Sequence, residues 1–267
     1  MLDDDAVTDA ARRLLAAERT REPIRQLSLQ YPDMTVEDAY RVQRALVVLK
    51  VAEGRTVRAR KIGLTSRAMQ QATSIGEPDY GVIFDDMFFD DGGTVPAGRF
   101  IRPRVEVELA FILGQPLKGP GVTALDVLDA TRWVTPALEI LDARVQVTDP
   151  ETGHLRTIVD TISDNAADAG IVTGGHAIRP DACDLRRIAA LLYVNEAIEE
   201  TGVAAGVLGH PANGVAWLAN RLAAYDEFLT AGQVILSGSF TRAVFVRAGD
   251  VIHADFGDLG AVTCRFR

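Results

Sequence analysis

The clearest hydrophobic pattern in the chain is a strict alternation between Phe100 and Phe111. A period of two predicts a β-strand with one apolar and one polar face. The apolar face carries Ile101, Val105, Val107, Leu109 and Phe111, and the polar face carries Arg102, Arg104, Glu106 and Glu108. Because residues two apart on a strand point the same way, Glu106 and Glu108 direct two carboxylates at one region of space.

Helical patterns come before this strand. Residues 6–20 are rich in Ala and Leu and carry basic residues on the polar side. A second helix opens at a capping box, Thr35 to Asp38, and runs to about Glu53, where Gly54 ends it. From residue 57 the pattern changes to that of strands. We therefore predict a helical N-terminal lobe of residues 1–56 and a mixed β catalytic domain of residues 57–267.

Short strands dominate the remainder. Many short strands without regular βαβ alternation favour a curled mixed sheet or barrel, so we predict an α+β fold with a mixed β-barrel-like core. We expect helices after Thr65–Ser66, after Thr123 and over Pro211–Ala224, a loop over residues 76–81, and turns at Asn195–Glu196 and residues 257–260. The expected strands are residues 57–63, 133–147, 170–173, 187–194, 197–203, 233–236, 244–246, 251–256 and 261–266.

Composition narrows the class of protein. The 267 residues have a net charge of −9 and a pI of about 5.0, which argues against nucleic acid and anionic membrane as partners, because both need a basic face. Two cysteines do not make a disulfide framework, and the acidic start lacks a signal-peptide pattern. We expect a reduced, cytoplasmic enzyme or binding protein.

The acids of the strand over residues 100–111 allow two interpretations. Glu106 and Glu108 are either solvated and neutralised by Arg102 and Arg104, or they share a divalent cation. Glu139 stands in a largely apolar run, where burial would make it a third carboxylate of the same site. Without Cys or His, such a set of oxygen ligands points to Mg²⁺ or Mn²⁺ rather than Zn²⁺.

Other residues could contribute acid–base chemistry or substrate contacts. Lys61 has only Ala59 and Gly63 as neighbours on its strand face, which leaves it room near a ligand. It is either a surface lysine or a group that relays a proton if its pKa is lowered. Asp79 lies in the expected loop, and the polar segments around Ser163 and Thr241 could present hydroxyls or could simply form turns.

These residues fall in motifs that together resemble the hydratase and decarboxylase branch of the fumarylacetoacetate hydrolase superfamily. The resemblance extends over nearly the whole chain. The motifs that carry it are Lys61–Ser66, Glu77–Gly81, Pro103–Glu108, Pro136–Glu139, Thr161–Ala166, Gly206–Pro211, Val215–Asn220 and Ser237–Thr241.

The resemblance implies a site and an assembly. It implies a core of the fumarylacetoacetate hydrolase C-terminal type, a homo-oligomer, and Mg²⁺ held by Glu106, Glu108 and Glu139. It also implies that Lys61 and Asp79 are catalytic and that Ser163 and Thr241 contact a small 2-oxo acid substrate. The hydrolases of the superfamily use a His–Glu pair after the lysine strand, but residues 65–80 contain no His, which favours hydration or decarboxylation.

The segments 84–89, 102–111 and 149–152 are most similar to members that act on a seven-carbon diacid. This implies hydration of 2-oxohept-3-ene-1,7-dioate, formed from its 2-hydroxydienoate tautomer, to 4-hydroxy-2-oxoheptanedioate in aromatic meta-cleavage catabolism. Alternatives are hydration of 2-hydroxypenta-2,4-dienoate, decarboxylation of 4-oxalocrotonate, or a non-catalytic partner subunit. A distal carboxylate would need an arginine, with Arg67, Arg144 and Arg242 as candidates.

Overall fold

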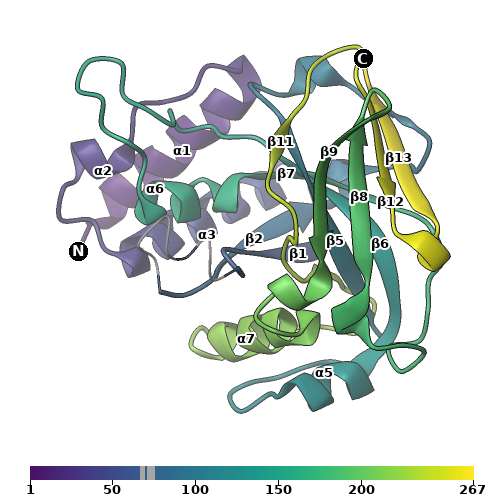
Figure 1. Cartoon of the computed structure of the whole chain (residues 1–267). Coiled ribbons are helices and arrows are strands. Elements are labelled where there is room, and N and C mark those ends of the chain that lie inside the picture. Colours follow the sequence, from purple (N-terminus) through teal and green to yellow (C-terminus); the bar gives the residue numbers. More distant parts are fainter. Residues whose placement is uncertain (67–69, 71–75) are drawn as a thin grey trace.

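Two β-sheets stand beside a group of N-terminal helices (Figure 1). The computed structural model describes residues 1–66, 70 and 76–267. The short helix expected after Thr65–Ser66 falls largely on residues outside this description. The N-terminal helices are α1 (Asp4–Thr20), α2 (Leu27–Gln30) and α3 (Val36–Ala52), and α6 (Ile158–Ser163) packs against α3.

The larger sheet mixes parallel and antiparallel pairs. Among the described residues, its strands lie in the order β2 (Asp79–Phe84), β1 (Val57–Gly63), β10 (Val234–Leu236), β5 (Arg104–Leu113), β6 (Thr131–Leu141), β7 (Asp168–Thr173) and β3 (Phe88–Phe89). The pairs β1–β10 and β3–β7 are parallel, whereas the pairs β1–β2, β10–β5, β5–β6 and β6–β7 are antiparallel. Strand β11 (Val244–Phe245) also pairs with β5.

The smaller sheet packs over one face of the larger one. Its described strands are β4 (Thr94–Val95), β13 (Ala261–Phe266), β12 (Val251–Asp255), β8 (Ala189–Val194) and β9 (Ala197–Val203), in that order. The turn between β8 and β9 places Asn195 and Glu196 at φ values of 51° and 71°, which suits a tight hairpin. The α+β class and the mixed β core predicted from the sequence are confirmed.

The two faces of β5 have different surroundings, as the alternation predicts. Val107 and Leu109 are fully buried in the main core, which also contains Ile252 and Val262 of the smaller sheet. The opposite face carries Ala110, which packs in a second, smaller apolar cluster that includes Ala59, Ala137, Ile171 and Leu236. Glu106 and Glu108 share that opposite face, so these small and aliphatic side chains form the floor beneath the acids.

Capping residues fix the helix boundaries. The Thr35 side chain accepts a hydrogen bond from the Asp38 backbone N–H and the Asp38 carboxylate accepts one from that of Thr35, as the predicted capping box requires. The same arrangement at Thr123 and Asp126 opens α5 (Ala124–Ala130). Helix α7 (Pro211–Ala223) begins at Pro211, as expected. The domain boundary after residue 56 stays a prediction.

Two expectations about elements are wrong. Residues 79–81 belong to β2 rather than to a loop. The sequence does not reveal this strand because β2 is buried on both faces and so shows no alternation. Strand β6 ends at Leu141 instead of residue 147. The next residue, Asp142, accepts hydrogen bonds from the backbone N–H groups of Ile101 and Arg102 through its carboxylate. Helix α6 was not predicted. No helix of the described residues is long and apolar enough to cross a membrane.

Candidate active site

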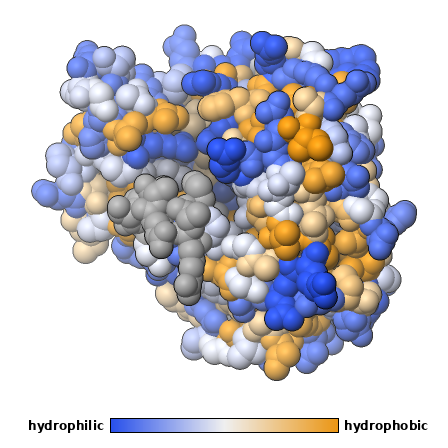
Figure 2. All heavy atoms as spheres, viewed as in Figure 1, coloured by the Kyte–Doolittle hydropathy of each residue, from blue (hydrophilic) through white to orange (hydrophobic). Residues whose placement is uncertain are grey.

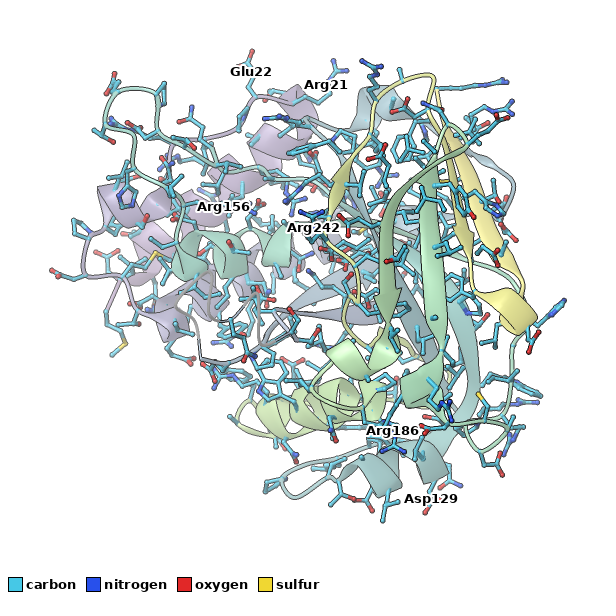
Figure 3. The ribbon with its side chains drawn as sticks, viewed as in Figure 1. Arg21, Glu22, Asp129, Arg156, Arg186 and Arg242 are labelled. Carbon is cyan, nitrogen blue, oxygen red and sulfur yellow. The ribbon has the colours of Figure 1, made fainter. Side chains whose placement is uncertain are left out.

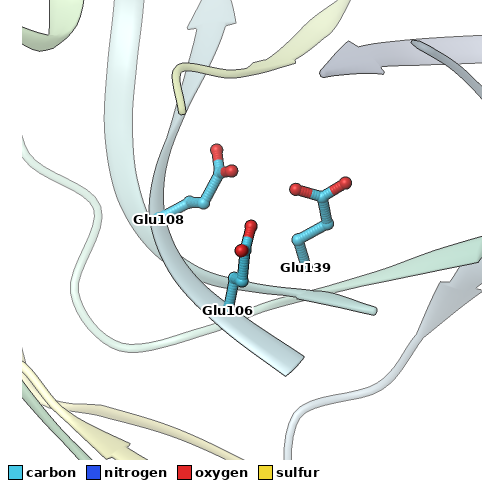
Figure 4. A group of neighbouring side chains, drawn as sticks. All are labelled: Glu106, Glu108 and Glu139. Carbon is cyan, nitrogen blue, oxygen red and sulfur yellow. The ribbon is translucent and has the colours of Figure 1, made fainter. Parts of the chain in front are cut away.

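Three carboxylates meet on the face of β5 and β6 that points away from the main core. Glu106 lies directly opposite Glu139 in the strand pairing, and Glu108 is the next residue on the same face of β5. One carboxylate oxygen from each lies within 4.8 Å of the others, and Figure 4 shows the three groups turned toward one space. Glu108 and Glu139 are buried and Glu106 is partly exposed.

The arginines of this strand do not neutralise these acids. Arg102 is exposed with its guanidinium 4.2 Å from the centre of the Phe245 ring, and neither Arg102 nor Arg104 forms an ion pair with a described residue. The neighbouring cation is Lys61, whose Nζ lies 3.2 Å from Glu139 Oε1. The interpretation of a solvated strand face neutralised by Arg102 and Arg104 is therefore wrong, because Glu108, Glu139 and Lys61 are buried. Glu106 is only partly exposed.

Lys61 is buried on β1, with 4% of its surface exposed. Burial lowers the pKa of Lys61, but the carboxylates of Glu139 and Asp79 outweigh it, so the pKa is raised above its ordinary value. The interpretation of Lys61 as a surface residue is wrong, and the lowered pKa that was the condition for a proton relay is not found. At neutral pH the ammonium group is charged and can donate protons.

Asp79 begins β2 and pairs with Gly63 of β1. A Cβ atom at Gly63 would lie 2.2 Å from Asp79 Oδ1, so glycine at this position gives the carboxylate its space. Burial raises the pKa of Asp79, and the nearby Lys61 partly opposes that shift. Asp79 and Lys61 are thus two buried titratable side chains on adjacent strands, and each shifts the pKa of the other.

Burial and mutual repulsion favour the protonated forms of the two acids on β5. They raise the pKa of Glu106 to about 7 and that of Glu108 well above its ordinary value, with Glu139 the largest repelling charge for each. Glu108 Oε2 accepts a hydrogen bond of 2.8 Å from the Gly238 backbone N–H, while Glu108 Oε1 is buried with no partner among the described residues. Buried oxygens normally have a partner, so Glu108 Oε1 has room for a hydrogen-bond donor or a cation.

A cavity is lined by Glu106, Lys61 and Asp79 but not by Glu108 or Glu139, and Figure 2 shows the surface hollowed between the N-terminal helices and the strands. Thr241 lines it and accepts the Val107 backbone N–H through Oγ1. Ser163 is fully buried at the end of α6, and its Oγ has no hydrogen-bond partner in the part of the chain that the structure describes, but it is not among the lining residues. The lining includes Lys61, Gly63, Leu64, Thr65, Ser66, Asp79, Arg104, Glu106, Leu141, Arg156, Thr161, Ala166, Ala167, Ser239 and Thr241.

Asp168 is a further buried acid close enough to Glu139 and Lys61 to interact with their charges, and the sequence pattern alone did not single it out. It begins β7, is buried, and neither of its carboxylate oxygens has a hydrogen-bond partner among the described residues. Burial and the charge of Glu139 raise the pKa of Asp168 well above its ordinary value. The signal was an acid two residues before Gly170 in an apolar segment, the same kind of signal that identified Glu139.

The arginines suggested for a distal carboxylate lie elsewhere. Arg144 is buried and committed to Asp164, to which its Nε donates a hydrogen bond of 2.5 Å. Arg242 is exposed and pairs with Glu200, and Arg67 lies outside the described residues. The guanidinium groups that line the cavity belong instead to Arg104 and Arg156.

Comparisons with known proteins identify relatives over the full chain. The chain is 60% identical over 266 residues, 100% of both proteins, to 2-oxo-hept-4-ene-1,7-dioate hydratase of Escherichia coli. It is 38% identical to 2-hydroxyhexa-2,4-dienoate hydratase of Comamonas testosteroni, over 100% of this chain and 99% of that protein.

A comparison with solved structures finds the same fold in a related enzyme. The structure of 4-oxalocrotonate decarboxylase from Pseudomonas putida G7, complexed with magnesium and adipate, superposes with a TM-score of 0.94 at 34% identity. The superposition covers 100% of this chain and 99% of that one. The family described as fumarylacetoacetate (FAA) hydrolase C-terminal matches residues 49–267. Sequence, fold and matched residues together confirm the resemblance, and the chain belongs to the fumarylacetoacetate hydrolase family.

Proposed function

We propose that this protein is a Mg²⁺-dependent hydratase. Its substrate is 2-oxohept-3-ene-1,7-dioate, formed from the 2-hydroxydienoate tautomer, and its product is 4-hydroxy-2-oxoheptanedioate. The E. coli hydratase that is 60% identical over its whole length supports this choice among the activities of the family. The place of the reaction would be the meta-cleavage catabolism of aromatic compounds.

The three glutamates fit a divalent cation. They offer oxygen ligands alone, which suits Mg²⁺ or Mn²⁺, and Glu108 Oε1 has no hydrogen-bond partner among residues 1–66, 70 and 76–267. The related decarboxylase was solved with magnesium. When bound, Mg²⁺ supplies a Lewis acid that can accept the C1 carboxylate and the C2 oxygen of a 2-oxo acid and stabilise negative charge on that oxygen.

Lys61 and Asp79 would manage the protons. In the first half of the reaction the 2-hydroxyl group loses a proton and C5 gains one, which yields the conjugated 2-oxo-3-enoate. The Lys61–Asp79 pair lines the cavity and can transfer that proton. In the second half, water adds at C4 and C3 is protonated, again by this pair. Thr241, which lines the cavity, and Ser163 are proposed substrate contacts.

The observation that carries this proposal is the convergence of Glu106, Glu108, Glu139 and Lys61 on one face of one sheet. A non-catalytic subunit that binds a keto acid would need no buried lysine among these carboxylates. A protein loaded with Mg²⁺ that is inert on every dienoate would favour the non-catalytic alternative.

The direct test is a diode-array assay with enzymatically generated 2-hydroxyhepta-2,4-dienedioate. We expect loss of the diene absorbance with Mg²⁺, no loss with EDTA, and recovery on adding Mg²⁺ back. Faster turnover of 2-hydroxypenta-2,4-dienoate would instead assign the five-carbon substrate. Because a decarboxylase 34% identical shares the fold, the same reactions are assayed for carbon dioxide, and its release from 4-oxalocrotonate would contradict hydration.

A further inference from the structure

Two guanidinium groups line the cavity that Glu106 and Lys61 also line. Arg104 stands two residues before Glu106 on the same face of β5, and Arg156 comes from the segment that leads into α6. Figure 3 shows Arg156 on that segment. Chain segments more than fifty residues apart in sequence therefore bring two positive charges to one cavity.

Neither guanidinium has an acidic partner. No carboxylate of the described residues lies within ion-pair distance of Arg104 or Arg156, and Arg156 Nη1 is buried without a hydrogen-bond partner. Burial, together with the charge of Arg104, lowers the pKa of Arg156. Two like charges that are partly desolvated and unpaired are unfavourable unless an anion joins them.

The other buried or partly buried arginines of the described residues pair with acids, whereas several exposed arginines do not. Arg144 pairs with Asp164, Arg60 with Glu227 and Arg55 with Glu18. The unpaired state of Arg104 and Arg156 is therefore a local feature of the cavity. A guanidinium presents several N–H donors in a planar fork that matches a carboxylate.

We infer that Arg104 and Arg156 form a subsite for the distal carboxylate of a dicarboxylic 2-oxo acid, and that this subsite selects diacids over monoacids. This inference rests on the proposed function, which places the 2-oxo acid end of the substrate at the three glutamates. Arg104 is roughly 6.5–7 Å along the strand from Glu106. That spacing is of the same order as the length of an extended seven-carbon chain, so one molecule can reach both sites.

Binding of unreactive analogues tests the subsite without turnover. We would titrate the Mg²⁺-loaded protein by calorimetry with 2-oxoheptanedioate and with 2-oxopentanoate, which lacks the distal carboxylate. The wild-type protein is expected to bind the diacid about 10- to 100-fold more tightly, the range typical of hydrogen bonds to charged groups. Equal affinity for the two acids would overturn the inference, whatever the variants do.

The variants then locate the subsite. Arg156→Met and Arg104→Met should each reduce the preference for the diacid about tenfold or more, while affinity for the monoacid stays within a factor of two or three. Arg156→Lys keeps a charge without the fork and should retain part of the preference. The matched control is Arg186→Met, an exposed arginine at the opposite end of the strands (Figure 3), which should change neither affinity.

Turnover separates this inference from the proposed function. If the wild-type protein prefers the diacid in binding but hydrates no dienoate, the proposed function fails and the subsite stands. If it hydrates the seven-carbon dienoate and the arginine variants lower kcat/KM for the five- and seven-carbon substrates equally, the subsite fails and the function stands. A selective loss of kcat/KM for the seven-carbon substrate supports both.

Discussion

A lysine and several acids share one face of the sheet so closely that their charges depend on one another. Lys61 Nζ lies 3.2 Å from Glu139 Oε1, and the pKa of Lys61 is raised because Glu139 and Asp79 outweigh burial. The same crowding raises the pKa of Glu106 to about 7. Removing any one of these charges therefore shifts the pKa values of the others.

Replacing Lys61 should separate proton transfer from Mg²⁺ affinity. In Lys61→Ala we expect kcat to fall about 10²- to 10⁴-fold, the usual contribution of a general acid or base. Mg²⁺ affinity should stay the same or become tighter, because a positive charge next to the three glutamates is lost. Steady-state kinetics and calorimetric titration of Mg²⁺ measure the two quantities.

Lys118→Ala is the matched control, since Lys118 is an exposed lysine paired with the exposed Asp226. It should leave both kcat and Mg²⁺ affinity unchanged. A Lys61→Ala enzyme with a near-normal kcat would reject the catalytic role of Lys61.

The sequence identifies individual site residues only where an acid stands out from the hydrophobic pattern around it. Glu106 and Glu108 follow from alternation on one strand, and Glu139 from an acid in an apolar run. Asp168 carries the same signal, but it begins a short strand in which the pattern is weak. Arg156 could not be predicted, because its position in the cavity depends on how the segment before α6 packs against β5.

At the scale of elements, alternation predicts a strand well, whereas a strand whose side chains are all buried can be missed. The alternating segment contains most of β5, whereas β2 is buried throughout and includes residues 79–81, which the sequence predicts as a loop. Helix α6 opens with Thr157 and Asp160, the same capping signature as α3 and α5, so the sequence did contain its start. Pairing order stayed out of reach because it depends on contacts distant in sequence.

The loop after β10 supports the site through Gly238. This residue has a φ of +119° and donates its N–H to Glu108, and a Cβ atom there would lie 2.3 Å from Thr65 Oγ1. Gly238→Ala should lower the free energy of unfolding by about 1–3 kcal/mol and also weaken Mg²⁺ binding, since the loop must move away from Glu108.

Gly153→Ala is a matched control for backbone strain. Gly153 has a φ of +73° but no atom within 4 Å of the added Cβ. Denaturant unfolding should show a loss of stability in both variants, and calorimetry should show weaker Mg²⁺ binding in Gly238→Ala alone. Unchanged Mg²⁺ affinity in Gly238→Ala would contradict the role of this loop.

At the scale of the whole molecule, the crowded acids link stability to pH and metal. Glu106 and Glu108 keep their protons to higher pH in the fold than in the unfolded chain, where a glutamate has a pKa of about 4.3. The Mg²⁺-free fold then binds more protons than the unfolded chain, so its stability falls as pH rises from about 4.3 through 7.

Added Mg²⁺ should offset this loss, because the metal binds the deprotonated carboxylates. We expect Mg²⁺ to raise Tm more at pH 8 than at pH 5.5 and to release protons on binding near pH 7. Scanning calorimetry in buffers of matched ionic strength measures the first effect. An equal rise in Tm at both values of pH would contradict the coupling.

The homo-oligomer expected from the family resemblance stays a prediction. Light scattering coupled to size-exclusion chromatography would give the mass in solution, to be compared with 28.8 kDa for one chain. A mass of a single chain at micromolar concentration would contradict it.

The central claim is that three glutamates on two neighbouring strands hold one divalent cation. The most direct measurement is a crystal structure with Mn²⁺ in place of Mg²⁺, in which anomalous scattering locates the metal. We predict one strong peak about 2.0–2.3 Å from carboxylate oxygens of Glu106, Glu108 and Glu139. A peak elsewhere, or no peak at this position in Mn²⁺-saturated crystals, would contradict the account.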